Sequence, residues 1–255
     1  MSDALDPVPP FSVDLLVVES VTVVTEARLD IETQSAEGPL DAVQAVVELF
    51  RQAVAAAMFS AGRDAMLEIE RADASAGRLA QRWRVSGIDV GAYRVLLNLL
   101  DVVSLNGMPL SGLRLRSAGR PATAADRRSL MAHAYPRWPI PLPFELWLKQ
   151  RLAGAKDVLI RFEFSRELSN DEFDAIEPLF VTWNHLITHG GYGNDVGEVE
   201  LDDAIVCGET YMAAPDTLEH EFVCAVAHLA AFEAVVNMAI GVHRRLCTLK
   251  RVEIT

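Results

Sequence analysis

The order of hydrophobic and polar positions in one part of this chain recurs in another part. When the sequence is shifted by 139 positions, residues 78–116 align without a gap with the segment that contains residues 228–245. The aligned pairs include Trp83 with Phe222, Ala92 with Ala231, Leu96 with Val235, Asn98 with Asn237 and Leu113 with Val252. A shift of 133 positions likewise aligns residues 40–50 with 173–183. We interpret both alignments as two copies of one structural unit.

Hydrophobic spacing predicts the elements of the first copy. Alternation over residues 13–32 is typical of strands and is too long for one, so we expect a break near Glu19 and Ser20. Apolar residues recur at helical spacing from Leu40 to Val54. The remaining expected elements are strands at 66–71, 79–85 and 110–116 and a helix at 90–105. The order is β-α-β-β-α-β, preceded by one extra strand.

The second copy begins with an alternating strand at residue 157. Ser169 and Glu172 have the spacing of a capping box, which predicts a helix start. A strand near 198–206 and a return strand near 218–224 complete the expected hairpin. The two shifts differ by six residues, and we expect this excess in the hairpin loop at 207–217.

The predicted fold class is α+β, a tandem duplicated ferredoxin-like fold with antiparallel sheets and a helical, proline-rich connector. We expect a flexible arm at 1–11, one copy at 12–116, the connector at 117–156 and the other copy at 157–255. Within the connector, short helices are expected at 123–134 and 143–152. The copies should associate through their sheets or side by side, with any ligand cavity between them.

Composition narrows the function classes. The net charge of −13 and the pI near 4.9 disfavour nucleic acid and anionic membranes as partners. Three cysteines without a CxxC spacing indicate reduced thiols, and the first residues do not resemble a signal peptide. The apolar window 222–242 contains His228, Glu233 and Asn237, so we interpret it as a strand and a buried helix. These features predict a cytoplasmic protein.

One cluster of polar residues surrounds the sequence HLITHGGYGND. His185 and His189 are four positions apart, which places both on one face of a helix end, and Tyr192 and Asp195 follow. This spacing suits a two-histidine metal site or acid–base chemistry, with Asp195 near enough to be a third ligand. The alternative is structural, because a histidine at a helix C-terminus stabilises the helix dipole and Gly190 would cap the helix.

A second group lies on the duplicated helix. Arg94 in the first copy aligns with Glu233 in the second, and Asn98 aligns with Asn237. A pseudo-twofold axis would bring Arg94 and Glu233 together as an ion pair, with the two asparagines bridging the copies beside it. Alternatively, these residues form the polar floor of a pocket in which Glu233 is a base.

His220 is the third candidate. It lies on a strand with Leu218 and Phe222 on the same face, so we expect it to face inward. Gln81 holds the same place in the first copy. The histidine is either satisfied by internal hydrogen bonds or lines a cavity.

The double β-α-β-β-α-β order resembles that of the tandem ferredoxin-like superfamily that includes the chlorite dismutases and the dye-decolourising peroxidases. This resemblance implies a haem bound by a histidine of the C-terminal copy, which by position would be His228 or His243. The GxxDG motif of the peroxidases is absent from this sequence, and no distal arginine can be assigned.

Two function hypotheses follow. The first is a non-catalytic binding or assembly protein, itself a homo-oligomer, that recognises a protein partner or a small molecule. The second is a small-molecule enzyme, with or without haem or metal, that has its cavity between the copies and uses His185, His189 or Glu233. The sequence identifies no cofactor.

Overall fold

The computed structural model describes residues 11–17, 24–34, 40–60, 63–106, 109–117, 123–125, 130, 134–149, 157–192, 207–223 and 228–255. The predicted arm at 1–11 lies outside these residues except for Phe11, which is buried. The predicted strand near 198–206 also lies outside them.

The first half of the chain has the predicted order of elements. The strands are β1 (Ser12–Val17), β2 (Thr25–Thr33), β3 (Met66–Ser75), β4 (Arg78–Ser86), β5 (Leu110–Ser117) and β6 (Thr123–Ala125), and the helices are α1 (Asp41–Ala55) and α2 (Ala92–Leu105). The expected break between the first two strands is confirmed. Both helices bury a continuous apolar face, which is why they form against a sheet rather than alone.

The second half repeats this order. Its strands are β7 (Glu145–Leu148), β8 (Asp157–Phe164), β9 (Cys207–Ala214), β10 (Thr217–Val223) and β11 (Leu249–Ile254), and its helices are α4 (Asn170–Thr188) and α5 (Leu229–Arg245). The predicted capping box is confirmed, since the Ser169 hydroxyl accepts from the backbone N–H of Glu172 and the Glu172 carboxylate accepts from that of Ser169. No helix in the described part of the chain is both long and apolar enough to cross a membrane.

Each half contributes one mixed sheet, and the fold is therefore α+β. The strand order is β3-β4-β2-β5-β1-β6 in the first sheet and β9-β10-β8-β11-β7 in the second. Within the first four strands of each order, adjacent strands run antiparallel to one another. The next strand is parallel in both sheets, β1 to β5 and β7 to β11.

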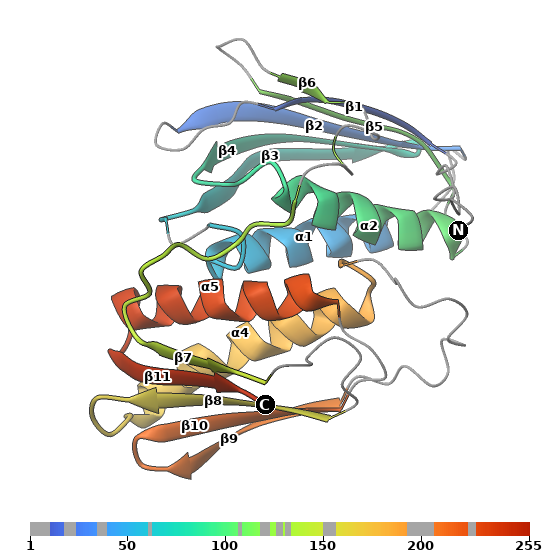
Figure 1. Cartoon of the computed structure of the whole chain (residues 1–255). Helices are drawn as coiled ribbons and strands as arrows, with labels where there is room; N and C mark the ends of the chain where they lie inside the picture. The colour runs from blue at the N-terminus through green and yellow to red at the C-terminus, as the bar shows by residue number, and fades with distance from the viewer. Residues whose placement is uncertain are drawn as a thin grey trace, which may run out of the picture.

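The two halves meet through their helices. Figure 1 shows four layers, with the first sheet outermost, then α1 and α2, then α4 and α5, and finally the second sheet. The expectation that the halves associate through their sheets or side by side is therefore wrong. The helices bring their apolar residues to the centre, whereas the outer sheet faces present charged side chains to solvent, so the sheets need no cover.

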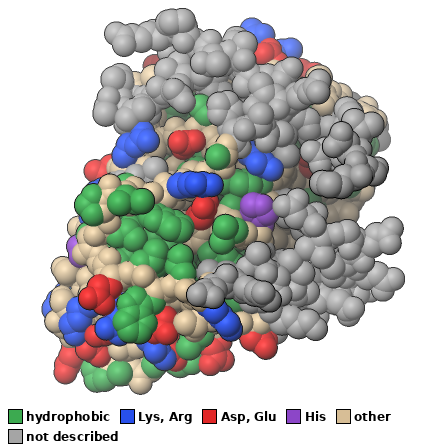
Figure 2. Space-filling model, in the orientation of Figure 1, with side chains coloured by type: hydrophobic (Ala, Val, Ile, Leu, Met, Phe, Trp, Pro, Cys, Tyr) green, Lys and Arg blue, Asp and Glu red, His purple; other side chains and the backbone are tan. Residues whose placement is uncertain are grey.

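The connector differs from its prediction. Residues 123–125 and 145–148, which lie within the two expected helices, are the strands β6 and β7. Leu130, within the first expected helix, is helical. β7 pairs with β11 as β1 pairs with β5, so it is the counterpart of the extra strand at the start of the chain. Figure 2 shows hydrophobic side chains gathered over the side where the connector of Figure 1 crosses between the sheets, and the exposed Ile140 and Trp147 belong to this segment.

The six-residue excess is also misplaced by the prediction. Residues 207–214 are strand β9, and the turn to β10 has only two residues, like the turn between β3 and β4. The shift between these two hairpins is 139 along both strands, from Ser75 to Ala214 and from Arg78 to Thr217. The shift between the helix ends is 133, from Ala55 to Thr188. The extra residues therefore lie between α4 and β9.

The ends of α1 and α4 are built alike. Ala57 and Gly190, which are 133 positions apart, both have positive φ, 63° and 73°. The next residues, Met58 and Gly191, donate their N–H groups back to Ala53 and Leu186, which are again 133 positions apart. This is the Schellman pattern of a helix C-terminus. It leaves the carbonyls of Met58 and Gly191 directed toward the opposite half.

Two asparagines bind these carbonyls reciprocally. Asn98 of α2 donates from Nδ2 to the Gly191 carbonyl at 3.0 Å and to the Tyr135 hydroxyl at 3.1 Å. Asn237 of α5 donates to the Met58 carbonyl and to the Pro136 carbonyl, both at 3.4 Å. Each amide therefore joins its own half, the opposite half and the connector. The prediction that the asparagines bridge the copies agrees with these bonds.

Replacing Asn98 by alanine should lower the free energy of unfolding by about 1–3 kcal/mol, because it leaves a buried carbonyl and a buried hydroxyl without their donor. Urea unfolding measures the loss. Asn106→Ala is the matched control, since Asn106 is exposed at the end of the same helix. Equal midpoints for the two variants would contradict the role assigned to Asn98.

Candidate anion-binding pocket

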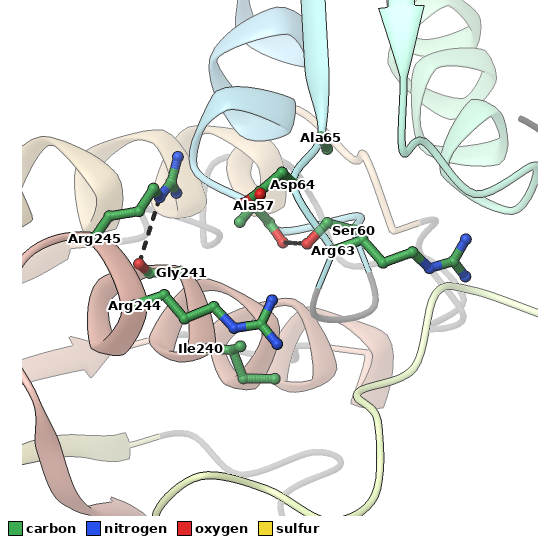
Figure 3. Close-up of a pocket in the computed structure, with 9 residues that line it drawn as sticks. All are labelled: Ala57, Ser60, Arg63, Asp64, Ala65, Ile240, Gly241, Arg244 and Arg245. Carbon is green, nitrogen blue, oxygen red and sulfur yellow. Dashed lines mark hydrogen bonds between the residues drawn. The ribbon is translucent and has the colours of Figure 1, made fainter. Parts of the chain in front are cut away.

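A pocket opens where the end of α1 meets the C-terminal turns of α5. Its cavity volume is about 50 Å³, and it is lined by Ala57, Ser60, Arg63, Asp64, Ala65, Ile240, Gly241, Arg244 and Arg245. The first five residues belong to the first half and the last four to the second. Figure 3 shows the loop after α1 above the last turns of α5, with the pocket between them.

The loop after α1 owes its position to the cap of that helix. The positive φ of Ala57 turns the chain away from the helix axis, and the Ser60 hydroxyl donates to the Ala57 carbonyl at 2.9 Å, which holds the turn. Ser60 is buried, and Arg63 and Asp64 then lead into β3. The turn therefore fixes the position of Arg63 at the boundary between the two halves, which we call the seam.

The other wall is the basic last turn of α5. Arg244 and Arg245 complement the partial negative charge at this helix end. Arg245 donates to the Ala55 carbonyl at 3.0 Å and to the Gly241 carbonyl at 3.4 Å, so it ties α5 to the end of α1. A Cβ on Gly241 would lie 2.9 Å from the Cβ of Ala57 and 2.8 Å from the Arg245 guanidinium. Only glycine permits this approach.

The pocket carries three guanidinium groups and one carboxylate, that of Asp64. It is a positive site on a chain of net charge −13. In Figure 3 the side chains of Arg63 and Arg244 extend toward the same side, whereas Arg245 turns to the other. Guanidinium groups stay charged at all ordinary pH values and match the oxygens of phosphates and carboxylates. The three guanidinium groups therefore equip the pocket to bind an anion.

The histidine cluster predicted from sequence lies elsewhere. His185 and His189 are exposed at the end of α4, with ring centroids 5.9 Å apart, and His189 Nδ1 lies 2.8 Å from the His185 carbonyl. Tyr192 is buried against Tyr135, and burial raises the pKa of its hydroxyl. Asp195 lies outside the described residues. No group of three or more metal-ligating side chains occurs within the described ranges.

The predicted Arg94–Glu233 pair is wrong. Glu233 pairs with Arg137 of the connector at 3.6 Å, and the Arg94 guanidinium lies 4.3 Å from the ring centroid of Tyr135. Glu233 and Arg94 were predicted to pair with each other, but each contacts a residue of the connector instead. Burial raises the pKa of the Glu233 carboxyl, and Arg137 opposes this shift. Within the described chain no contact joins Glu233 to His185 or His189.

His220 faces inward as predicted and is satisfied there. Its Nδ1 lies 2.8 Å from the Thr210 hydroxyl and its Nε2 lies 3.2 Å from Asn184 Oδ1, while its ring stacks on Phe180. The Asn184 oxygen can only accept, so in the neutral imidazole the proton lies on Nε2 and Nδ1 accepts from the Thr210 hydroxyl. Gly208 completes the arrangement, since a Cβ there would lie 2.6 Å from the imidazole. Burial lowers the pKa of His220 to about 4.

The two histidines that the haem resemblance singled out already have structural contacts. His228 caps α5, with Nδ1 accepting from the Ala230 N–H at 3.0 Å and its ring against Tyr135. His243 Nδ1 accepts from the Leu249 N–H at 3.1 Å beside Phe144. Neither lines the seam pocket described above.

Sequence reasoning did not find the pocket as a site. No binding role for Arg63, Arg244 or Arg245 was predicted from the sequence. The available signal was a basic residue after the first helix and a basic pair at the end of the last helix. Only the packing of α1 against the second half brings them together.

Comparisons with known proteins add no function. No model of a protein family matches the chain, and no curated protein does so. Among solved structures, the ferredoxin protease FusC, in a mutant bound to Arabidopsis ferredoxin, is similar over 89% of this chain and 35% of that one, with 11% identity and a TM-score of 0.20. This chain thus spans about a third of its length. A Cas6 product complex is similar over 87% and 93%, with 12% identity and a TM-score of 0.18. Scores this low support no inference about the fold or the activity.

The buried histidine makes stability depend on pH. His220 stays neutral in the folded state down to about pH 4, whereas in the unfolded chain it takes up a proton near pH 6.5. Between pH 6.5 and pH 4 the unfolded chain therefore binds more protons than the folded chain. The free energy of unfolding should fall by up to about 3 kcal/mol over this interval.

Urea unfolding between pH 7 and pH 4 tests this dependence. His220→Gln should flatten the decline, and His185→Gln, which changes an exposed histidine, should leave it unchanged. A decline of the same size in the His220→Gln variant would assign the pH dependence to other groups.

Proposed function

We propose that this chain is a non-catalytic binding protein that consists of two ferredoxin-like copies and binds a small anion between them. The strand orders β3-β4-β2-β5 and β9-β10-β8-β11, each antiparallel, support the ferredoxin-like assignment, because a β-α-β-β-α-β unit produces this order. The matched caps and the reciprocal asparagine bonds support the duplication.

One observation carries the binding function, which is that both halves contribute arginines to a single pocket at their seam. Arg63 comes from the first half, and Arg244 and Arg245 come from the second. A cavity of about 50 Å³ is well below the volume of drug-sized ligand sites and is suited to a small ion. The ligand class that fits is a small phosphate or carboxylate, and the seam between copies is a common place for such a site.

The buried titratable groups favour binding over catalysis. His220 uses both ring nitrogens in internal hydrogen bonds, and Glu233 is paired with Arg137. Burial raises the pKa of the Cys247 thiol, which disfavours the reactive thiolate. None of these residues lines the arginine pocket.

Isothermal titration with inorganic phosphate tests the proposal. The wild-type chain should bind phosphate, and the double variant Arg63→Gln with Arg244→Gln should bind at least about ten times more weakly, because each charge-assisted hydrogen bond contributes about 1.5–3 kcal/mol. Arg245 is left intact because it holds the seam together.

Arg84→Gln is the matched control, since Arg84 lies on the outer sheet face beside Glu68 and Glu70, away from the pocket. The proposal would be overturned by phosphate binding of equal strength in the double variant and the control, or by no binding to the wild-type chain.

A further inference from the structure

The outer face of the first sheet carries a row of four arginines in direct register. Arg71 on β3 is opposite Arg82 on β4, Arg82 is opposite Arg28 on β2, and Arg28 is opposite Arg116 on β5. All four side chains are exposed or partly exposed. Neighbouring strands are about 4.8 Å apart, so the row crosses about 14 Å of the sheet.

A bulge in β3 creates one end of this row. The register of β3 shifts between Ile69, which is opposite Trp83, and Arg71, which is opposite Arg82. In an uninterrupted ladder the residue opposite Arg82 would be Glu70, which would give an ion pair. The bulge instead places Glu70 beside Arg84, at 3.7 Å, and brings a fourth arginine to the row. Bulges commonly re-aim side chains near functional sites.

The row is only partly neutralised. Arg28 pairs with Asp30 at 3.2 Å and Arg116 pairs with Asp14 at 2.7 Å. Within the described part of the chain, Arg71 and Arg82 form no ion pair. Like charges directly opposite each other on a sheet destabilise it. The free protein therefore carries an unfavourable arrangement that a bound anion would relieve.

The second sheet has the usual arrangement at its corresponding face. Arg161 on β8 lies between Glu219 on β10, at 2.7 Å, and Glu253 on β11, at 3.1 Å. Charges of opposite sign alternate across these three strands, so the second sheet compensates its arginine internally. Around Arg161 the described part of the second sheet therefore has no equivalent of the partly neutralised arginine row.

A shallow cavity of about 320 Å³ lies over the end of the row that contains Arg71 and Arg82. Arg28, Arg71, Asp73, Ala80, Gln81 and Arg82 line it. This volume is within the range of small-molecule sites. The described lining residues include no aromatic ring on which a base could stack, so recognition depends on charge. Acidic residues border the row on both sides, with Asp30 and Asp73 on one and Glu26 and Glu68 on the other, which favours a narrow ligand over a duplex.

We propose that this arginine row binds a short chain of linked phosphates, with three or more phosphoryl groups aligned across the strands. Arg71, Arg82 and Arg28 each contact phosphate oxygens, and the ligand replaces the missing counter-charge. The site is on the opposite side of the first sheet from the pocket between the halves, so it is independent of the proposed function.

Titration calorimetry with inorganic tripolyphosphate tests the site. The wild-type chain should bind tripolyphosphate at least about ten times more tightly than orthophosphate. Arg82→Gln and Arg71→Gln should each weaken tripolyphosphate binding at least about tenfold. Arg84→Gln, on the same strand and face but already paired with glutamates, should have no effect. The pocket variant Arg63→Gln with Arg244→Gln should also bind normally, which separates this site from the other.

A second measurement does not require the ligand. At low salt and without tripolyphosphate, Arg82→Gln should raise the urea midpoint, because it removes the repulsion between neighbouring arginines, and Arg84→Gln should lower it or leave it unchanged. Unchanged tripolyphosphate binding in Arg82→Gln, or tighter binding of a single-stranded nucleic acid or an acidic peptide than of tripolyphosphate, would overturn the proposal.

Discussion

The architecture depends on how two helix ends are satisfied at the seam. α1 and α4 both end in a left-handed residue, and this geometry directs the next carbonyl away from its own helix. At the seam those carbonyls would be buried without a donor, which is costly. Asn98 and Asn237 supply the donors, each from the opposite half. These reciprocal hydrogen bonds fix the distance and the register of the two helix layers. The shape of the neighbouring pocket follows from this packing.

The connector belongs to the same arrangement. Tyr135 and Pro136 take the second hydrogen of each asparagine amide, and Arg137 neutralises Glu233. Three consecutive residues thus contact polar side chains of α2 and α5. The two sheets differ in the arrangement of their charges. Around Arg161 the second sheet alternates charges of opposite sign, whereas the first sheet places four arginines opposite one another. Several arginines gather at two places, the seam pocket and the row on the first sheet, and these are the places where we propose that an anion binds.

Local signals predicted much of the fold. The alternation of β2 and β10, the capping box of Ser169 and the inward parity of His220 are short-range patterns, and each is confirmed. β7 escaped prediction because prolines precede it and because it pairs with β11, more than a hundred positions away, so nothing nearby marks it as a strand. The six extra residues were misplaced because the two alignments show only that they lie between the two matched helices. The alignments do not show where in that interval they lie.

The sites were harder to predict for a physical reason. Arg63 and Arg244 are 181 positions apart and converge only through helix packing. The Arg94–Glu233 pair was predicted from symmetry alone, and contacts with Tyr135 and Arg137 of the connector take its place. The arginine row depends on a one-residue bulge, which the alternation of β3 does not reveal.

The most direct test of the central claim is an amide chemical-shift map of the intact chain during titration with inorganic phosphate. The account predicts shifts that saturate at Ser60, Arg63, Gly241 and Arg244, on both sides of the seam. Shifts confined to one half, or no saturable shifts at these four residues, would contradict a binding site built jointly by the two halves.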